Sequence, residues 1–470
     1  MSVKVRCLMP ALAAVLVGLL AAPAVAHDGP KSNAGNGGPT PGGSGASFTS
    51  YRMQMASRLD LTQLGAPDAD ANQFLASAWG WVDTLDNADP SDDREYALMA
   101  RRSDLAIVDI TVPTAPVLIG NVQRTAGTAA TTWRDVRVIG NWAYVGVDSA
   151  THGVQSFDLT RVRGVTTPTL FNADAVFLGT AEAPGMSNVH SFAVNHTAST
   201  PYLYAAGSNT RSGLPNAPQT PGGLQIIDTT DPMNLSIAGS WQDDGYIHET
   251  SVFTYHGPDQ LHFGKSLAFN CTGNGGDPAA SPNSFSITDV SNPASVLRLS
   301  QHRYADTGYT HQGWLTDDHE FFLINDELDE TGNLTGSKTR THMYDVRDID
   351  NPIYRGFFEW GIGAIDHNLY VAGDYIFQAH YTRGVRVFEI GDLDSLDPND
   401  WLTEVAWFDS YPQDDSKSFN GVWQVYPYLP SGSIIASDIN GGLFVLQMVP
   451  EPGSLALLSL GALALLRRRR

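Results

Sequence analysis

The sequence predicts an all-β fold, a seven-bladed β-propeller whose seventh blade is closed by a strand from the N-terminal side. Three observations predict it: a short strand motif that recurs seven times, companion strands around each copy, and an unmatched strand near the N-terminus. No stretch of the body sustains a helical period of apolar residues. The alternative is an open array of β-sandwich sheets or two smaller domains.

The recurring motif is an alternating strand that ends on a carboxylate or an amide. Its copies follow one another at intervals of about 44 to 70 residues, a period that fits propeller blades of four short strands. In three copies a proline follows four residues after the terminal aspartate, where it ends the strand and starts a turn. The copies are residues 104–109, 153–158, 223–228, 284–289, 341–345, 384–389 and 442–447.

Each blade also needs partner strands, and the sequence supplies them. Short aromatic or β-branched runs precede the motif at residues 142–147, 202–206, 321–324, 375–377 and 433–436, and similar runs follow it at 116–120, 234–237, 294–297 and 353–357. The last copy has no strand after it. Residues 55–61 fit the missing strand, so we expect them to complete blade seven beside residues 419–448.

The N-terminal segment has the pattern of an export signal. Lys4 and Arg6 precede an apolar stretch and a run of small residues that ends at Ala26. Residues 1–26 are therefore predicted to be a secretory signal peptide that signal peptidase removes after Ala26. Residues 27–49 are rich in Gly, Pro and Ser and are expected to be a flexible leader, which leaves residues 50–448 for the propeller.

The C-terminal segment, residues 449–470, combines a Pro-Glu-Pro motif, a short apolar run and a terminal arginine cluster. The apolar run at residues 454–466 is shorter than the ~20 residues that cross a bilayer comfortably. The arginines should stay on the cytoplasmic side. An ordinary membrane anchor is the alternative. The residues that carry the pattern are Pro450, Glu451, Pro452, Arg467, Arg468, Arg469 and Arg470.

This C-terminal pattern resembles the PEP-CTERM sorting signal of Gram-negative bacteria. The resemblance implies transient attachment to the inner membrane, processing by an exosortase and delivery to the cell surface or the extracellular matrix. Membrane contact would then be confined to the two signal segments before processing.

The body of the chain resembles the LVIVD repeat and the choice-of-anchor B family of exported bacterial β-propellers. The resemblance rests on the repeated strands and on the run at residues 310–330, and it covers about residues 50–448. It implies one kind of propeller body that carries alternative sorting signals, and it implies no activity. Within the run, Asp329 and Glu330 are expected in a long exposed loop of blade five.

Charge and cysteine content narrow the function. The chain has 28 basic and 50 acidic residues, a net charge of −22, which disfavours binding to nucleic acid or to anionic membranes. Of the two cysteines, Cys7 falls in the predicted signal peptide, so Cys271 has no intramolecular partner. Its place in a predicted strand indicates a buried structural thiol.

Four histidines fall into one register when the predicted blades are aligned. The innermost strands of blades three to six start at histidines, that of blade two at an aspartate, and those of blades seven and one at small residues. Such strand starts should meet at one mouth of the central channel, where second-strand ends also arrive. The first set is His190, His248, His311, His367, Asp135, Gly421 and Ala78; the second includes Glu327 and His380.

The histidine register is a candidate metal site. Neutral imidazole is the commonest metal ligand and carboxylates bind or orient beside it, so this donor set favours a divalent transition metal such as Zn, Cu, Fe or Ni. The alternative is a set of polar residues that satisfy backbone groups and channel waters. His256 and His319 are expected in turns on the opposite face.

These observations leave two main classes of function. One is an exported surface or matrix propeller that binds an unidentified ligand or partner at its channel mouth, without catalysis. The other is a metal-dependent hydrolase or oxidase that uses the histidine site. A purely structural role in the matrix would make no demand on the histidines.

Overall fold

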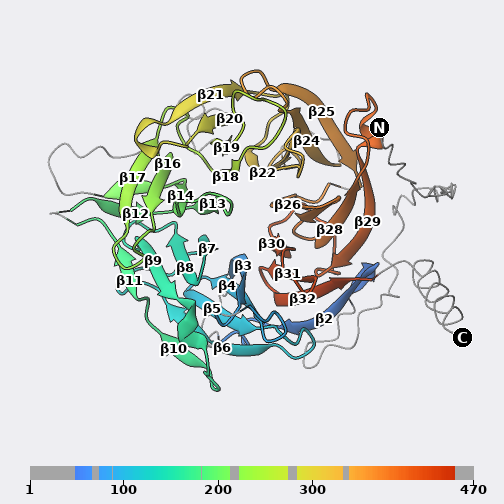
Figure 1. Cartoon of the computed structure of the whole chain (residues 1–470). Helices are drawn as coiled ribbons and strands as arrows, with labels where there is room; N and C mark the ends of the chain where they lie inside the picture. The colour runs from blue at the N-terminus through green and yellow to red at the C-terminus, as the bar shows by residue number, and fades with distance from the viewer. Residues whose placement is uncertain are drawn as a thin grey trace, which may run out of the picture.

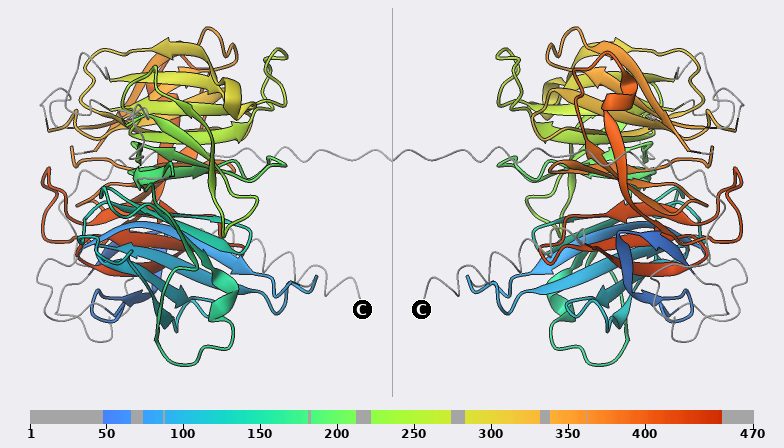
Figure 2. Two further views of the ribbon diagram at one scale, coloured as in Figure 1. Left: turned by 90° about the vertical axis from the view of Figure 1, so that its left-hand side faces the viewer. Right: turned by 90° about the vertical axis from the view of Figure 1, so that its right-hand side faces the viewer.

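Seven β-sheets form a ring around a central axis in this protein (Figure 1). The computed structural model describes residues 48–65, 74–86, 88–180, 183–211, 222–273, 283–331, 338–361 and 363–449. The innermost strand of each sheet surrounds the centre in Figure 1, and the strands run from one face of the ring to the other in Figure 2. The predicted all-β, seven-bladed propeller is therefore confirmed.

Each blade is a sheet of four or five strands that follow one another from the innermost strand outward. Blade one contains β3 (Leu75–Asp83), β4 (Arg94–Arg101), β5 (Asp104–Asp109), β6 (Val117–Gln123) and β10 (Thr169–Phe171). Blade two contains β7 (Arg134–Ile139), β8 (Trp142–Val147), β9 (Val154–Asp158) and β11 (Ala175–Phe177). Blade three contains β13 (Ser191–Val194), β14 (Tyr202–Ala206), β16 (Leu224–Asp228) and β17 (Ser236–Trp241).

The second half of the ring follows the same plan. Blade four contains β18 (Glu249–Thr254), β19 (Ser266–Thr272), β20 (Ser284–Asp289) and β21 (Leu297–His302), and blade five contains β22 (Thr310–Leu315), β23 (Phe321–Asp326), β24 (Thr339–Asp345) and β25 (Ile353–Trp360). Blade six contains β26 (Leu369–Ala372), β27 (Tyr375–Ala379), β28 (Val385–Ile390), β29 (Leu402–Asp409) and β1 (Thr49–Tyr51). Blade seven contains β30 (Val422–Tyr426), β31 (Ser433–Asp438), β32 (Gly442–Met448) and β2 (Met53–Leu59).

A few short elements lie outside this plan. A separate hairpin pairs β12 (Gly185–Asn188) with β15 (Asn209–Arg211). Three single-turn helices are η1 (Leu159–Val162), η2 (Pro293–Ser295) and η3 (Pro398–Asp400). None of the helices in the described part of the chain has the length and apolarity that a membrane crossing requires. The predicted signal peptide, nearly all of the predicted leader and residues 450–470 lie outside the described residues.

An N-terminal strand closes blade seven, as the sequence predicts. β2 pairs antiparallel with β32, and its Met53 lies opposite Met448. The strand begins two residues earlier than residues 55–61, the predicted span. Two further connections were not foreseen: β1 adds a fifth strand to blade six, and β10 adds a parallel fifth strand to blade one. Both are three-residue strands, too short to show an alternating pattern.

The aspartate that ends the repeated strand has a local structural role. In blades one, three and four its side chain accepts a hydrogen bond from the backbone N–H two residues later, at 2.8 to 3.0 Å (Asp109, Asp228 and Asp289). This is an Asx-turn, which turns the chain out of the strand. The loop that follows also binds the neighbouring blade, because Ser57 donates to the Pro113 carbonyl and Ser156 donates to the Pro232 carbonyl.

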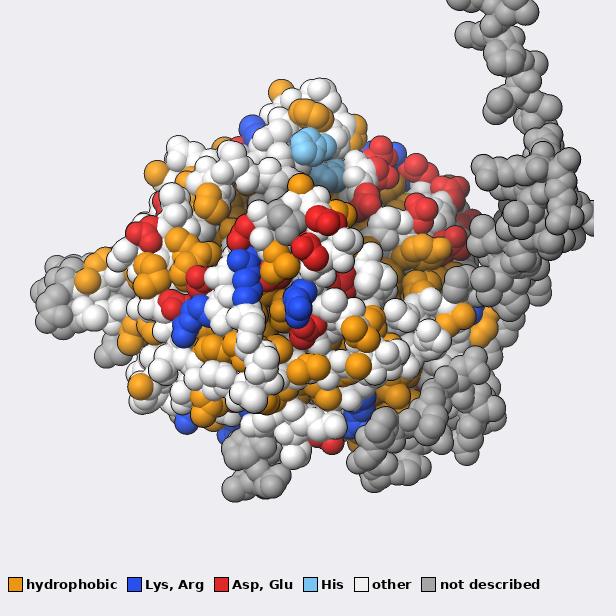
Figure 3. Space-filling model, turned by 60° about the horizontal axis from the view of Figure 1, so that its bottom comes forward, with side chains coloured by type: hydrophobic (Ala, Val, Ile, Leu, Met, Phe, Trp, Pro, Cys, Tyr) orange, Lys and Arg blue, Asp and Glu red, His pale blue; other side chains and the backbone are white. Residues whose placement is uncertain are grey.

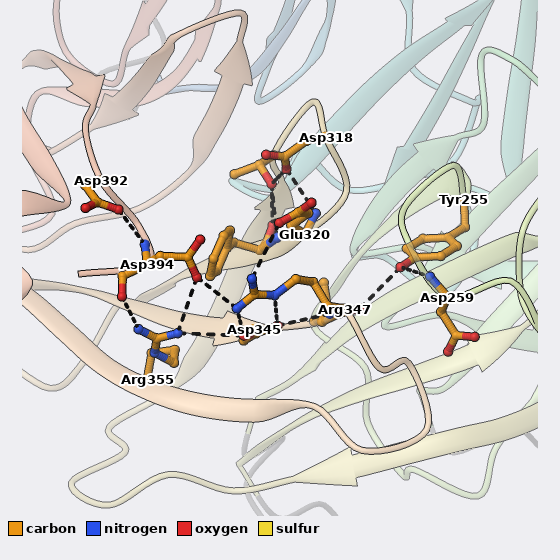
Figure 4. Close-up of polar contacts among 12 residues, drawn as sticks. Tyr255, Asp259, Asp318, Glu320, Asp345, Arg347, Arg355, Asp392 and Asp394 are labelled. Carbon is orange, nitrogen blue, oxygen red and sulfur yellow. Dashed lines mark hydrogen bonds and ion pairs between the residues drawn. The ribbon is translucent and has the colours of Figure 1, made fainter. Parts of the chain in front are cut away.

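The ring has two chemically different faces. We call the face where the innermost strands begin the histidine face, and the opposite face, where the repeated third strands end, the turn face. On the turn face Arg347 binds Asp345 and lies 2.9 Å from Asp394 and 3.8 Å from Glu320 (Figure 4). These ion pairs join the loops of blades five and six.

The core consists of apolar side chains packed within and between the blades. The largest cluster includes residues from blades six, seven, one and two. Cys271 is buried within the packing of blade four, as predicted. On the outer side near blade one, apolar, acidic and basic side chains are mixed, and several acidic side chains gather toward one edge of the view (Figure 3).

Candidate metal centre

The four histidines of the predicted register are neighbours on the histidine face. Adjacent rings have centroids 4.3 Å apart for His190 and His248, 4.3 Å for His248 and His311, and 4.1 Å for His311 and His367. The series continues with Trp423, whose ring lies 4.5 Å from that of His367. We call these four imidazoles the histidine ring.

Blade seven therefore contributes Trp423 to this position, and the predicted Gly421 is wrong. A β-bulge explains the difference. Val422 pairs with Asp438 and Gln424 pairs with Ser437, so Trp423 is an extra residue in the inner strand. His311 is an extra residue of the same kind between Thr310 and Gln312. Bulges re-aim side chains, and here they place both rings in the series.

A register shift also overturns the predicted residue of blade one. Asn325 donates to the His367 carbonyl from blade five, and Ser437 donates in the same way to the Ala76 carbonyl. Ala76 therefore occupies the position predicted for Ala78. Leu75 and Ala78 pair with Arg101 and Met99, so two residues of the inner strand oppose one.

Backbone carbonyls fix the tautomers of two of the imidazoles. His248 Nδ1 lies 3.2 Å from the His311 carbonyl oxygen, and His367 Nδ1 lies 2.6 Å from the Trp423 carbonyl oxygen. Since a carbonyl can only accept, Nδ1 carries the proton in both rings. The lone pair of each ring is therefore on Nε2, where a metal can bind.

Glu327 brings a carboxylate to two of the histidines. Its Oε2 lies 3.6 Å from His311 Nε2, and its Oε1 lies 3.8 Å from His367 Nε2. The Tyr381 hydroxyl donates to Glu327 Oε1 at 2.7 Å and holds the side chain in place. His311, Glu327 and His367 can each offer one atom such that all three lie within 4.8 Å of one another. This is the spacing that a single ion can bridge.

A second group of three shares His311. His248, Glu249 and His311 also offer one donor atom each within 4.8 Å. Asn368 donates to both carboxylate oxygens of Glu249, at 3.1 and 3.2 Å. Sequence reasoning missed Glu249, because strict strand alternation points it away from the side of His248.

Burial sets the protonation of the site. Loss of water lowers the pKa of His367 to about 3 and holds the pKa values of His248 and His311 well below the ordinary value. These imidazoles are neutral at pH 7, which is the form that binds metal. Burial also raises the pKa of Glu327 to about 7, although the Tyr381 hydrogen bond lowers it in part.

His190 differs from the other three. Burial lowers its pKa, but the hydrogen bond and the charge of Asp148 outweigh burial and raise the pKa above its ordinary value. The two side chains are 3.4 Å apart, between His190 Nδ1 and Asp148 Oδ2. The imidazole at this end of the ring is therefore engaged by a carboxylate outside the channel series.

Two predicted members of the site lie elsewhere. His380 Nε2 lies 2.6 Å from Gln378 Oε1, and its ring packs against Trp360 at 5.0 Å rather than against the histidine ring. Asp135 lines the channel, but it accepts hydrogen bonds from Arg137 at 2.6 Å and from the Phe192 N–H at 2.7 Å. Ser77 also donates to it.

The space enclosed by these residues is small. The cavity has a volume of about 60 Å³ and is bordered by all four imidazoles, by both glutamates and by Trp133. It has room for an ion and a few waters, and an organic molecule would have to bind above it. At the mouth Trp133 is 47% exposed, and Phe419, which packs against Tyr381, is 50% exposed.

The other predicted histidine positions lie away from this cavity. His319 Nδ1 accepts from the His256 backbone N–H at 3.0 Å in the turns of blades four and five. A third group with the spacing of metal ligands, Asp259, His262 and Asp350, belongs to the turn regions of blades four and five. In it the Asp259 carboxylate already accepts from the Ile349 N–H.

Two family models match parts of the chain. A model described as the PEP-CTERM protein-sorting motif matches residues 449–470, and a model described as the LVIVD repeat matches residues 94–124, 131–150 and 279–300. The chain thus carries LVIVD repeats and a PEP-CTERM sorting motif. The motif implies exosortase processing and an exported surface protein.

Comparison with whole proteins adds little. No curated protein matches the chain. Among solved structures, it is similar to a protein from Lactobacillus plantarum, with 14% identity over 81% of this chain and 97% of that chain and a TM-score of 0.44. It is also similar to a chain of the mitotic checkpoint complex, with 11% identity over 76% of this chain and 88% of that chain and a TM-score of 0.46. Likenesses this distant carry no argument about function.

Proposed function

We propose that the protein is an exported surface or extracellular-matrix propeller that binds a divalent transition metal in its histidine ring and presents this site to a ligand or partner. The observation that carries the proposal is the group of His311, Glu327 and His367, whose donor atoms converge within 4.8 Å. Two neutral imidazoles and one carboxylate suit Zn, Fe, Cu or Ni.

The donor chemistry supports a metal over a set of structural polar groups. His311 Nδ1 is buried and has no hydrogen-bond partner among the described residues. The His311 and His367 Nε2 atoms face Glu327 at distances too long for hydrogen bonds. A bound ion would satisfy donors that protein contacts leave unsatisfied.

The size of the cavity supports a platform role. A space of about 60 Å³ admits the metal and waters, so a larger ligand would meet the site from above, between Trp133 and Phe419. Exposed aromatic rings beside a polar centre are typical of recognition surfaces.

The export route is part of the proposal. We infer a signal peptide at residues 1–26 cleaved after Ala26, a leader at 27–49, a propeller at 50–448 and a sorting segment at 449–470 in a Gram-negative cell, with transient inner-membrane attachment. Membership of the choice-of-anchor B family fits this organisation. The PEP-CTERM motif and the LVIVD repeats support it.

Elemental analysis of the purified protein tests the metal. We expect about one transition-metal ion per chain after loading and dialysis, and less than a tenth of that in a His311→Ala/His367→Ala double variant. Glu327→Gln keeps the shape of the side chain and should weaken binding at least about tenfold. The matched control is His256→Ala/His319→Ala, which removes two imidazoles far from the cavity and should leave the metal content unchanged.

Two results would refute the metal site. One is a metal content that is the same in the double variant and in the unmodified protein. The other is no retained metal under any loading condition. Cu²⁺-loaded protein adds a direct readout, because bound imidazoles give nitrogen hyperfine structure in the electron paramagnetic resonance spectrum that the double variant should lack.

The same group also favours a second candidate function, a metal-dependent hydrolase or oxidase. Three protein ligands leave coordination positions open for water, oxygen or substrate, as in catalytic metal sites. Activity on ester, phosphoester or oxygen-dependent test substrates should then require the loaded metal and disappear in Glu327→Gln. Metal binding without any such activity would favour the platform.

A further inference from the structure

A second polar cluster lies beside the histidine ring, at the border of blades five and six. Asp329 and Glu330 follow β23, and Asp366 precedes β26, and each of the three carboxyl side chains is 0% exposed. The expected exposed loop at Asp329 and Glu330 is therefore wrong. Packing between the two blades, which a single sequence does not reveal, covers these side chains.

The three carboxylates lack hydrogen-bond donors. Among the described residues, none reaches any of the six carboxylate oxygens of Asp329, Glu330 and Asp366. Lys417 Nζ approaches, but it donates to the Glu330 backbone carbonyl at 2.7 Å. Burying even one carboxylate without a partner costs several kcal/mol, so this cluster requires a compensating positive charge or protons.

A neighbouring carboxylate shows what a satisfied group looks like in the same place. Asp326, also 0% exposed, accepts hydrogen bonds from the Tyr304 hydroxyl at 2.9 Å and from the Gly308 N–H at 3.1 Å, and another from the Tyr309 N–H. The fold thus satisfies one buried acid fully and leaves the next three open toward one another.

An imidazole is aimed at the cluster from the adjoining strand. His342 on β24 is 1% exposed, and its Nδ1 lies 2.8 Å from the Tyr354 hydroxyl. Its Nε2 has no hydrogen-bond partner among the described residues and lies 3.6 Å from Asp329 Oδ2. One imidazole cannot balance three carboxylates, but it offers a fourth donor.

We propose that Asp329, Glu330 and Asp366 bind a hard divalent cation, such as Ca²⁺ or Mn²⁺, with His342 facing the same position. Carboxylate oxygens are the ligands that Ca²⁺, Mg²⁺ and Mn²⁺ prefer, and an imidazole in the set would favour Mn²⁺ among them. The ion would join the loop after β23 to the loop before β26 and so tie blade five to blade six.

The electrostatics agree with a missing positive charge. Burial, and next the charges of Asp366 and Asp329, raise the pKa of Glu330 far above its ordinary value. Burial, followed by the charges of Asp329, Asp326 and Glu327, does the same to the pKa of Asp366. The competing explanation is that shared protons, such as one between Glu330 and Asp329, neutralise the cluster without a cation.

Thermal unfolding of the chelator-treated, full-length protein at pH 7 tests the proposal. Ca²⁺ or Mn²⁺ at about 100 times its dissociation constant should raise the melting temperature by about 3 °C or more. Calorimetric titration of the same protein should give one ion per chain. Mg²⁺ serves as a third arm, since its demand for octahedral geometry separates it from the other two.

Three variants define the site. Glu330→Gln and Asp366→Asn should abolish the cation-dependent rise, and they should fold at least as well as the unmodified protein because each removes a buried charge. Glu359→Gln is the control, because Glu359 on β25 pairs with Arg340 outside the cluster and should keep the full rise.

The outcomes separate this site from the histidine ring. The His311→Ala/His367→Ala variant should keep the Ca²⁺ or Mn²⁺ response even though it loses the transition metal. No rise with any of the three cations, or a full rise in Glu330→Gln and Asp366→Asn, would overturn the proposal in favour of shared protons. If either variant fails to fold, the remaining one and the electron paramagnetic resonance spectrum of bound Mn²⁺ decide.

Discussion

The histidine face and the turn face of the propeller use polar residues in opposite ways. On the turn face, Arg347 and Asp345 are paired with each other and with neighbouring loops, and both are in partial contact with water (Figure 4). On the histidine face, His311, Asp329 and Asp366 are buried with side-chain atoms that have no hydrogen-bond partner among the described residues.

This difference indicates which polar residues serve stability and which serve binding. Paired charges at a surface add a little stability and require nothing further. Buried groups without partners reduce stability unless a ligand completes them, so a fold that keeps several of them on one face is equipped to bind there. The comparison predicts that variants of the two faces will fail in different assays.

The largest effect should come from opening the ring, which damages both faces. Met53 on the closing strand is 1% exposed, and Met53→Asp would bury an unpaired charge against β32. We expect a loss of about 4 kcal/mol in the free energy of unfolding, measured by denaturant titration. Gln54→Asp, at the exposed neighbouring position, should change it by less than about 0.5 kcal/mol. Equal effects would mean that the strand does not close the ring.

Removing the transition metal should weaken the histidine face next. With free metal at about 100 times its dissociation constant, chelation should cost about 3 kcal/mol of unfolding free energy. The cost should vanish in His311→Ala/His367→Ala and persist in Arg347→Met on the turn face. Chelation that destabilises all three proteins alike would place the ion outside the histidine ring.

Breaking the ion pairs of the turn face should have a smaller effect that does not depend on metal. Arg347→Met removes the partner of Asp345, Asp394 and Glu320 and keeps most of the apolar stem. We expect a loss of about 1 kcal/mol, with metal content unchanged. If this variant lost metal, the two faces could not be treated as independent.

The smallest predicted effect is a dependence on pH. Burial favours a higher pKa for Asp345, but the Arg347 hydrogen bonds outweigh it and lower the pKa below the ordinary value. A carboxylate with a lowered pKa stabilises the folded state above its unfolded pKa, and this contribution is lost as the pH falls through the folded pKa. Unfolding between pH 5 and pH 2, at about half-unit steps, should therefore be steeper in pH for the unmodified protein than for Arg347→Met. Parallel curves would contradict the assignment.

Sequence patterns were sufficient for the scaffold because blades are local structures. Residues 104–109, 142–147 and 284–289 are strands with the predicted bounds, since alternation and the terminal aspartate act within a few residues. The closing strand could be placed because the repeat lacked a partner. The three-residue strands β1 and β10 were missed because they carry no pattern of their own.

The site was predictable in part. Identical starts of the inner strands brought His190, His248, His311 and His367 together, because one register around a ring places equivalent residues side by side. Trp423 could not be foreseen, since a bulge adds one residue to its strand and moves the equivalent position. His380 was misplaced because its orientation depends on contacts with Gln378 and Trp360 from packed strands.

The sequence by itself determined the repeat, the order of the strands, the register of histidines and the sorting motif, all of which depend on neighbours along the chain. The tertiary structure decided which side chains lost contact with water and with hydrogen-bond partners. Asp329, Glu330 and Asp366 show the reason: burial is a property of the two blades packed together, and no local pattern in either blade encodes it.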